Sequence, residues 1–279
     1  MENSIFGFKK KTKAEGFVGA EGATEAAVRN EETLKKKLDD AIRNGDFELF
    51  FQPIVDIESG TPVCAEAFAR FADGNGGYED TSAMIELAKQ DGSVIFLSDL
   101  IVSRVCNFIK TGILDEKDLS YIQINLSVND WNDPRLFERV MSTIKGNDVG
   151  TSQIMLELTE DCMSDNMDTV IKNVEEFNRV GVRLAMDNFG AANTNVTQML
   201  HMPLNMIKID KDLIAKAHLS SHSMEILSEM VKLFEKFGLE MVAEGVENAN
   251  QSDMVMDMGC TYGQGNCYGM PVSQADFCR

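Results

Sequence analysis

The sequence predicts an α/β fold, a TIM-like (β/α)8 barrel in which one strand is antiparallel. Strand-like apolar segments alternate with amphipathic segments of helical period from residue 48 onward. Such alternation is typical of a parallel sheet, and eight strand-like segments suit a closed barrel. The first two of these segments are joined only by a short turn at Ser59 and Gly60, which leaves no room for a crossover helix. This pair is therefore predicted to be an antiparallel hairpin.

The expected elements follow in order along the chain. A helix is expected first, over residues 30–44, because apolar residues recur there at helical spacing, and Gly45 suits its C-cap. The expected strands lie at residues 48–57, 62–71, 121–128, 153–159, 182–188, 206–210, 240–245 and 261–265. The expected helices between them lie at residues 84–110, 134–145, 166–181, 223–238 and 250–259.

The domain organisation predicted is a flexible N-terminal tail over residues 1–30, followed by one barrel domain over residues 31–279. The tail is rich in Gly, Ala, Lys and Glu and carries no sustained periodicity. Four of its lysines could contact an anionic membrane, but this attraction is weak and a solvated tail is favoured. These lysines are Lys9, Lys10, Lys11 and Lys13.

Composition excludes several classes of function. The chain carries 45 Asp and Glu against 26 Lys and Arg, a net charge of −19, so a broad DNA or RNA interface is not expected. A small phosphate ligand is compatible with this charge if metal ions invert the local field. No apolar run is long enough to span a membrane, and no secretory signal is recognisable. The six cysteines form no CxxC pair, so we expect free thiols and a cytoplasmic location.

Polar residues cluster at the ends of the predicted strands, where the active sites of barrels lie. A charge inside an apolar strand is costly unless it is paired or metal-bound, so a shared site is favoured over scattered salt bridges. The residues are Glu66, Arg70, Asn125, Glu157, Asp187, Asn188, Lys208, Asp210, Glu244 and Gln264. Their oxygen donors, without His or Cys, indicate Mg²⁺ or Mn²⁺ and not Zn²⁺. With an arginine nearby, this set suggests hydrolysis of a phosphate ester by a metal-activated water.

The same segments also match a family pattern. The chain carries FFQPIVDIESG, AEAFARF, INLS, LELTE, MDNFG, MIKID, AEGVE and GCTYGQG in order between residues 47 and 277. In motif order and spacing it resembles the EAL domain, a bacterial module that hydrolyses or binds cyclic di-GMP. The family fold is a barrel with one antiparallel strand, which agrees with the hairpin expected from the short first turn.

The resemblance implies two divalent cation sites, for Mg²⁺ or Mn²⁺. By motif, the first cation would be held by Glu66, Asn125, Glu157 and Asp187. Asp187 would bridge to the second cation, with Asn188 as a further ligand.

The resemblance also implies roles in catalysis and substrate binding. Lys208 would orient the attacking water, and Glu244 would act as general base or as an outer ligand of the water network. Gln52 and Arg70 would contact the dinucleotide, with Arg70 at a phosphate. Gln264 stands at a polar position near the second metal, among the residues expected to bind substrate.

The chain departs from the family pattern beside the second cation. The family has Asp-Asp before Phe-Gly, whereas this chain has Asp187 and Asn188. An amide oxygen brings no charge, so the second site is expected to be weaker. The following loop, residues 191–195, also departs from the family sequence, while Glu160, which supports this loop in the family, is retained.

Three functions remain open at this point. The first is a metal-dependent phosphodiesterase that converts cyclic di-GMP to the linear dinucleotide, with weakened activity. The second is a degenerate receptor that binds cyclic di-GMP without cleaving it, which Asn188 and the altered loop favour. The third is a protein-interaction module, against which the retained Gln52 and Arg70 argue. A homodimer and a signalling protein partner are left open.

Overall fold

The computed structural model describes residues 32–163, 166–191 and 202–279. Its first described element is a helix over residues 32–44, which ends before Gly45 as predicted. Leu38 and Ala41 of this helix are buried against the rest of the domain. The predicted tail, residues 1–30, lies outside the described residues, as does the predicted loop 191–195 except for Ala191.

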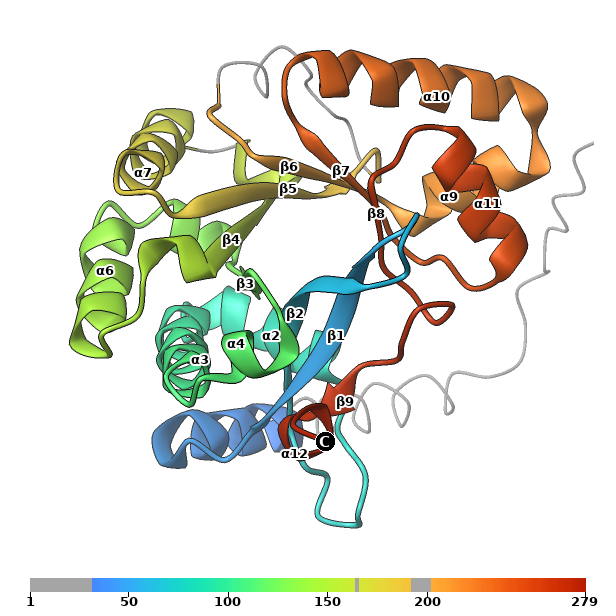
Figure 1. Ribbon diagram of the computed structural model, residues 1–279. Coiled ribbons are helices and arrows are strands. Elements are labelled where there is room, and N and C mark those ends of the chain that lie inside the picture. The colour runs from blue at the N-terminus through green and yellow to red at the C-terminus, as the bar shows by residue number, and fades with distance from the viewer. Residues whose placement is uncertain (1–31, 164–165, 192–201) are drawn as a thin grey trace, which may run out of the picture.

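Eight strands close into a barrel, which confirms the predicted fold class (Figure 1). They are β1 (Glu48–Asp56), β2 (Pro62–Arg70), β3 (Tyr121–Asn125), β4 (Ile154–Thr159), β5 (Arg183–Phe189), β6 (Met206–Ile209), β7 (Glu240–Ala243) and β8 (Tyr262–Gly263). Neighbouring strands from β2 to β8 run parallel. β1 lies between β8 and β2 and is antiparallel to both, so it closes the ring.

The hairpin between β1 and β2 forms at the turn that the sequence indicates. The Ser59 backbone N–H donates to the Asp56 carboxylate at 2.8 Å, and the Gly60 N–H donates to the Asp56 carbonyl, also at 2.8 Å. Gly60 has a φ of 69°, a left-handed conformation that favours glycine. The register of this hairpin places Gln52 directly opposite Glu66, which brings two predicted site residues together.

Helices surround the strands in Figure 1. The helices between Thr81 and Asp257 are α2 (Thr81–Asp91), α3 (Val94–Ile109), α4 (Ile113–Lys117), α5 (Val128–Trp131), α6 (Leu136–Gly146), α7 (Met167–Arg179), α9 (Lys211–Leu219), α10 (Ser221–Lys236) and α11 (Ala249–Asp257). Short 3-10 turns, Thr151–Gln153 and Glu160–Met163, lie on either side of β4. The main hydrophobic core lies between the helices and the barrel wall, and burial of this apolar surface is the main stabilising contribution.

The single helix expected over residues 84–110 is wrong, because the structure has two helices there. α2 ends at Asp91, and Gly92 follows as its C-cap with a φ of 78°. This left-handed residue reverses the chain direction, so α3 begins as a new helix at Val94. The apolar pattern continues through Gly92, which is why periodicity alone did not reveal the break.

The C-terminal end adds two elements that the sequence did not predict. β9 (Val272–Ser273) pairs with β1 at Phe51 and Phe50, and α12 (Gln274–Phe277) follows it. The Phe277 ring lies 5.2 Å from that of Phe51 on β1. These contacts attach the C-terminal residues to the antiparallel strand.

The barrel interior contains two layers along the strands. A lower apolar layer consists of Ile54, Cys64, Tyr121, Met155, Ala185, Met206 and Val242. All of these residues except Tyr121 lie two positions along the chain from a predicted site residue, as Met206 does from Lys208. Side chains two positions apart point to the same face of a strand, so both layers face the barrel interior. Gln123 belongs to this layer and donates to the sulfur atoms of Met155 and Met206 at 3.3 and 3.2 Å. The site therefore lies on a layer of largely apolar side chains inside the barrel.

The cysteines are free, as expected: Cys64, Cys106, Cys162 and Cys260 are buried, whereas Cys267 and Cys278 are exposed. Among the described residues, no helix has both the length and the apolar character needed to cross a membrane.

Candidate active site

The predicted site residues meet at the carboxyl-terminal end of the parallel strands. Glu66 comes from β2, Asn125 from the end of β3, Glu157 from β4 and Asp187 from β5. Lys208 lies on β6, and Glu244 and Gln264 directly follow β7 and β8. Seven elements of the barrel thus contribute to one cluster, as the shared-site hypothesis expects.

Lys208 is the centre of this cluster. Its Nζ lies 2.7 Å from Glu66 Oε2, 3.1 Å from Glu157 Oε2 and 3.0 Å from Glu244 Oε1. Asp187 is a fourth carboxylate, with its Oδ1 at 3.5 Å. Because the Lys208 side chain is only 1% exposed, its ammonium exchanges hydration for these ion pairs.

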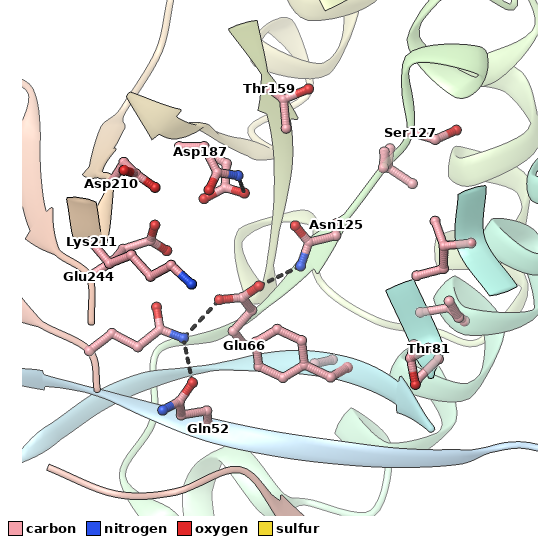
Figure 2. Close-up of a pocket in the computed structure, with 18 of the residues that line it drawn as sticks. Gln52, Glu66, Thr81, Asn125, Ser127, Thr159, Asp187, Asp210, Lys211 and Glu244 are labelled. Atoms are coloured by element: carbon pink, nitrogen blue, oxygen red, sulfur yellow. Dashed lines mark hydrogen bonds between the residues drawn. The ribbon is translucent and has the colours of Figure 1, made fainter. Parts of the chain in front are cut away.

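Glu66 is held by amide donors in addition to Lys208. The Asn125 side-chain amide donates to Glu66 Oε1, and Gln264 Nε2 donates to Glu66 Oε2 at 2.8 Å (Figure 2). Gln264 Nε2 also lies 3.2 Å from Gln52 Oε1, while Gln52 Nε2 donates to the Gly269 carbonyl at 3.0 Å. Gln52 therefore uses both ends of its amide within the protein, in contacts that orient Gln264.

The buried carboxylates differ in their affinity for a proton. Burial alone raises the pKa of Glu66, but attraction to Lys208 and the donated hydrogen bonds outweigh it and lower the pKa below its ordinary value. Burial, followed by repulsion from Glu66, raises the pKa of Glu157 well above its ordinary value. Of this pair, Glu157 therefore has the higher affinity for a proton.

Glu244 and Asp187, which line the cavity, also bind a proton more tightly than usual. Burial raises the pKa of Glu244 to about 8, with Lys208 acting in the opposite direction. Burial likewise raises the pKa of Asp187. Burial lowers the pKa of Lys208, but the surrounding carboxylates more than compensate and raise it well above its ordinary value. Lys208 therefore holds its proton more tightly than an exposed lysine does.

Asn188 lies beside Asp187 in an unusual backbone conformation. Its φ of 55° is left-handed, which asparagine tolerates better than most residues. Its side-chain amide donates a hydrogen bond to Asp187 Oδ2. The other oxygen, Asp187 Oδ1, is buried and accepts no hydrogen bond among the described residues. Farther along, the Gly190 N–H donates to Glu160 at 2.9 Å, so Glu160 contacts the loop that follows β5.

Arg70 stands at the end of β2, at the edge of the cavity. Its guanidinium carbon lies 5.4 Å from the ring centre of Phe68 and 5.7 Å from that of Phe50. One of its nitrogens donates to the Ala69 carbonyl at 2.8 Å. The guanidinium therefore lies near two aromatic rings, and Arg70 lines the cavity.

An open cavity of about 690 Å³ lies above the cluster. Most of the predicted site residues line it, and Figure 2 shows Gln52, Glu66, Asn125, Asp187 and Glu244 around it. Lys208 and Glu157 do not line it, because they are 0% and 1% exposed and lie beneath its floor. The other wall is largely apolar and is formed by Phe68, Ile85, Val94, Leu97, Ile101 and Val128.

The donor chemistry fits a hard divalent cation, although the finished coordination is not formed. Carboxylate and amide oxygens from Glu66, Asn125 and Asp187 face the cavity, and Asp187 Oδ1 lacks a hydrogen bond among the described residues. In the described part of the chain, no three acidic, His or Cys side chains already form a cation site. The Lys208 ammonium is paired with the carboxylates of Glu66 and Glu157 in this arrangement. The residues therefore fit Mg²⁺ or Mn²⁺ by type, and binding requires the side chains to close around the ion.

Two residues that shape the site were not identified from the sequence. Trp131 is fully buried, and its indole N–H donates to the Glu157 carbonyl at 3.1 Å, which fixes the end of β4. Lys211 lines the cavity from the start of α9. Lys211 directly follows the KID motif, and this position could have indicated that it belongs to the site. Nothing in the sequence around Trp131 distinguishes it from an ordinary core residue.

Known proteins share this sequence pattern and fold. The EAL domain model matches residues 35–271. The cyclic di-GMP phosphodiesterase NbdA of Pseudomonas aeruginosa is 26% identical over 87% of this chain and 31% of its own length. The probable cyclic di-GMP phosphodiesterase PdeB of Escherichia coli is 29% identical over 90% of this chain and 48% of its length. The chain thus spans less than half the length of each of these two relatives.

Solved structures match the barrel closely. The phosphodiesterase PaMucR in complex with cyclic di-GMP aligns with a TM-score of 0.81 and 25% identity, over 88% of this chain and 99% of the other. The FimX EAL domain of Pseudomonas aeruginosa, bound to cyclic di-GMP, aligns with a TM-score of 0.76 and 18% identity, over 85% of this chain and 96% of that one. The family model covers most of the sequence, and the chain belongs to the EAL domain family.

Proposed function

We propose that the chain is a metal-dependent phosphodiesterase that hydrolyses cyclic di-GMP to the linear dinucleotide at a low rate. The observation that carries this proposal is the burial of Lys208 among four carboxylates beneath an open cavity. Burying several charges together costs free energy that apolar residues would not cost. A module that only bound a ligand or a protein would have no need for such a cluster.

The ligand is proposed from the family and from the chemistry of the cavity. NbdA and PdeB are named as cyclic di-GMP phosphodiesterases, and PaMucR was solved with this dinucleotide. In this chain Arg70 and Lys211 supply positive charge at the cavity for phosphate groups. The apolar wall suits planar bases, which a polymer-binding surface would not enclose.

The cations proposed are Mg²⁺ or Mn²⁺. Glu66, Asn125, Glu157 and Asp187 would hold the first ion, and Asp187 with Asn188 would hold a weaker second one. When bound, such ions polarise the phosphate and lower the pKa of water. An ion near Glu157 and Asp187 would also favour their charged forms, against the effect of burial.

The protein's own residues divide the remaining tasks. Glu244 has the most exposed side chain of the four carboxylates, at 18%, so it is the one placed to accept a proton from a water in the cavity. Lys208 holds the carboxylates together from below and keeps its own proton. Gln264, fixed by Gln52, orients Glu66, while Arg70 positions a phosphate at the cavity edge.

One observation favours a second candidate, a receptor that binds cyclic di-GMP without cleaving it. The Asn188 amide donates to Asp187 Oδ2, so a hydrogen-bond donor stands beside an oxygen that would bridge the two cations. This contact lowers the negative charge available to a second ion. Binding of the dinucleotide at the cavity edge does not depend on it.

The compartment and the domain boundary are also part of the proposal. We place the chain in the cytoplasm, because all six cysteines are free thiols and a reducing environment keeps them so. Residues 31–279 would act as one EAL domain, with any signalling partner acting on it from outside.

The experiment is incubation of the purified chain with cyclic di-GMP and either Mg²⁺ or Mn²⁺, with linear product and bound ligand quantified together. The phosphodiesterase proposal expects product to accumulate beyond one equivalent per protein chain. Stoichiometric binding without product would establish the receptor instead. Neither binding nor product would leave only the interaction module.

A further inference from the structure

A buried carboxylate, Asp130, lies at the centre of the hydrogen bonds that hold α5, the short helix between β3 and β4. Asp130 is 0% exposed, and its Oδ2 accepts from the Ser127 hydroxyl at 2.6 Å, the Ser127 N–H at 3.0 Å and the Ser98 hydroxyl at 2.7 Å. Its other oxygen, Oδ1, lies 3.3 Å from Nη2 of Arg139 on α6. The Asp130 N–H in turn donates to the Ser127 hydroxyl at 3.2 Å, which completes a capping box at the start of α5. These donors compensate for the burial of the Asp130 side chain.

Both ends of the α5 segment are bonded to Glu157. Asn125 ends β3, and only Leu126 separates it from Ser127, the N-cap of α5. The backbone N–H of Leu126 and the indole N–H of Trp131 donate to the same Glu157 carbonyl, at 3.3 and 3.1 Å. Asn125 and Glu157 are themselves neighbours in the β3–β4 ladder. A shift of α5 would therefore move two of the residues proposed to hold the first cation.

Contacts from α6 and α7 hold the far end of α5. Arg139 on α6 pairs with Asp130 and with Asp133, which follows α5. Asn173 on α7 is fully buried, and its side-chain amide donates to the Trp131 carbonyl at 3.0 Å and to the Asp133 carbonyl at 3.1 Å. A helix of four residues is too short to be stable on its own. The position of α5 is therefore set by its contacts with the surrounding helices, among which those of Asp130 are the most numerous.

This arrangement costs more free energy than a purely structural role requires. Apolar residues of similar volume often stabilise a fold as well as a buried ion pair does, whereas buried polar groups can impose one geometry on the chain. The geometry imposed here belongs to the cavity, because Ser98 and Ser127 line it and Asp130 does not. Any influence of Asp130 on the site must therefore pass through Ser127 and the α5 segment.

We propose that Asp130 is a positioning residue for the first cation. By capping α5 through Ser127, it fixes Asn125 on β3 against Glu157 on β4, so that their side chains converge on one ion. This inference rests on the proposed function, since it takes Asn125 and Glu157 as ligands. Residues that orient metal ligands without touching the metal typically change its affinity about 10- to 100-fold when they are replaced.

A Mn²⁺ titration of the full chain, followed by electron paramagnetic resonance of the free ion, tests this proposal without relying on turnover. We expect Asp130→Ala to raise the Kd of the tighter Mn²⁺ site by at least about tenfold. Asp130→Asn keeps a side-chain oxygen for Ser127 and Ser98 and should bind Mn²⁺ more tightly than Asp130→Ala. Ser127→Ala removes the other half of the capping box and should also weaken binding. Combining it with Asp130→Ala should add little, because both changes break one contact.

Asp276→Ala is the matched control. Asp276 forms the same Ser-x-x-Asp arrangement with Ser273 at the start of α12, which is also a four-residue helix, and both residues lie outside the cavity. This change should leave the Mn²⁺ affinity as it is in the wild type. Circular dichroism checks that each variant is folded, and Ser127→Ala carries the test if Asp130→Ala does not fold.

Three results would overturn the proposal. The first is a wild-type Kd for Mn²⁺ in folded Asp130→Ala or in Ser127→Ala. The second is an Asp130→Asn variant as weak as Asp130→Ala, and the third is an equal loss in Asp276→Ala. A wild type that binds no Mn²⁺ would instead contradict the proposed function, and this inference with it.

Discussion

The side chain of Asn188 donates a hydrogen bond to Oδ2 of Asp187, the carboxylate that the proposed function assigns to both cations. The family pattern has a second aspartate at this position, which would repel Asp187 and attract a metal ion. The amide does the opposite, because it stabilises the Asp187 carboxylate without any cation. Under the proposed function, this single exchange accounts for a second cation that binds weakly at a site which retains its other groups.

Asn188→Asp should therefore raise phosphodiesterase activity. The gain should be largest at low Mn²⁺ concentration, because the added carboxylate acts mainly on metal affinity. Rates across a Mn²⁺ titration measure this, with Asn178→Asp on the exposed face of α7 as a control that adds the same charge elsewhere. If the wild type is as fast as Asn188→Asp at every Mn²⁺ concentration, Asn188 is not the weak point. A small gain that grows when the family's loop is grafted over residues 191–195 would assign the defect to the loop.

Removing the central cation should destabilise the fold. Lys208→Met leaves Glu66, Glu157, Asp187 and Glu244 buried around an apolar side chain, and we expect a loss of about 3–5 kcal/mol in the free energy of unfolding. Lys35→Met is the control, since the Lys35 side chain is 50% exposed in its pair with Asp91. Its loss should stay below about 1 kcal/mol, the range of surface pairs. Urea unfolding of both variants gives the comparison, and equal losses would contradict a central role for Lys208.

The metal-free protein should lose stability as the pH rises from 4.5 towards 8. The pKa of Glu244 is about 8 in the folded protein against an ordinary 4.5, so the folded state binds more protons than the unfolded state in this window. Stability is then greatest at the acidic end and falls as Glu244 ionises. Glu244→Gln should flatten the decline in thermal midpoint with pH, whereas Glu175→Gln, an exposed change on α7, should not. Some decline of the thermal midpoint with pH should remain in Glu244→Gln, because the pKa values of Asp187 and Glu157 are also raised. An identical slope in wild type and Glu244→Gln would refute this assignment.

Binding of cyclic di-GMP should depend on Arg70. Phe50 and Phe68 hold its guanidinium at the cavity edge, so the planar donor is already oriented for a phosphate. We expect Arg70→Ala to weaken binding by at least about tenfold, the effect of losing a charge-assisted contact. Calorimetry measures this, and Arg135→Ala, at a side chain 74% exposed and outside the cavity, is the control. Unchanged affinity in Arg70→Ala would place the ligand elsewhere.

The barrel could be predicted from the sequence because the features that indicate it involve residues close together in the chain. Strand and helix periods alternate, and the Ser59–Gly60 turn is short enough to require a hairpin, so the antiparallel strand could be inferred. The break at Gly92 was missed because the apolar pattern runs through it on both sides. β9 was missed for a different reason: Val272 and Ser273 form a strand only through pairing with β1, more than 200 residues earlier in the chain.

The composition of the site was predictable, but its internal arrangement was not. Charged residues at strand ends must meet in a barrel, and this argument brought Glu66, Glu157, Asp187, Lys208 and Glu244 together. Sequence could not reveal that Lys208 lies beneath the cavity floor, since this depends on side-chain direction within the closed ring. The same holds for Gln52, which lines the cavity as a substrate contact would and also bonds to Gln264 and to the Gly269 carbonyl.

The measurement that tests the central claim most directly is product formation from cyclic di-GMP by wild type and Glu157→Ala, with Mn²⁺ and with excess EDTA. Glu157 lies under the cavity floor, 3.1 Å from Lys208, so its removal alters the cluster and leaves the cavity lining in place. We expect the wild type to release linear dinucleotide with Mn²⁺ and to stop in EDTA, and we expect Glu157→Ala to form none while it still binds the ligand. Full wild-type activity in EDTA, or undiminished activity of Glu157→Ala, would contradict a metal-dependent phosphodiesterase built on this buried cluster.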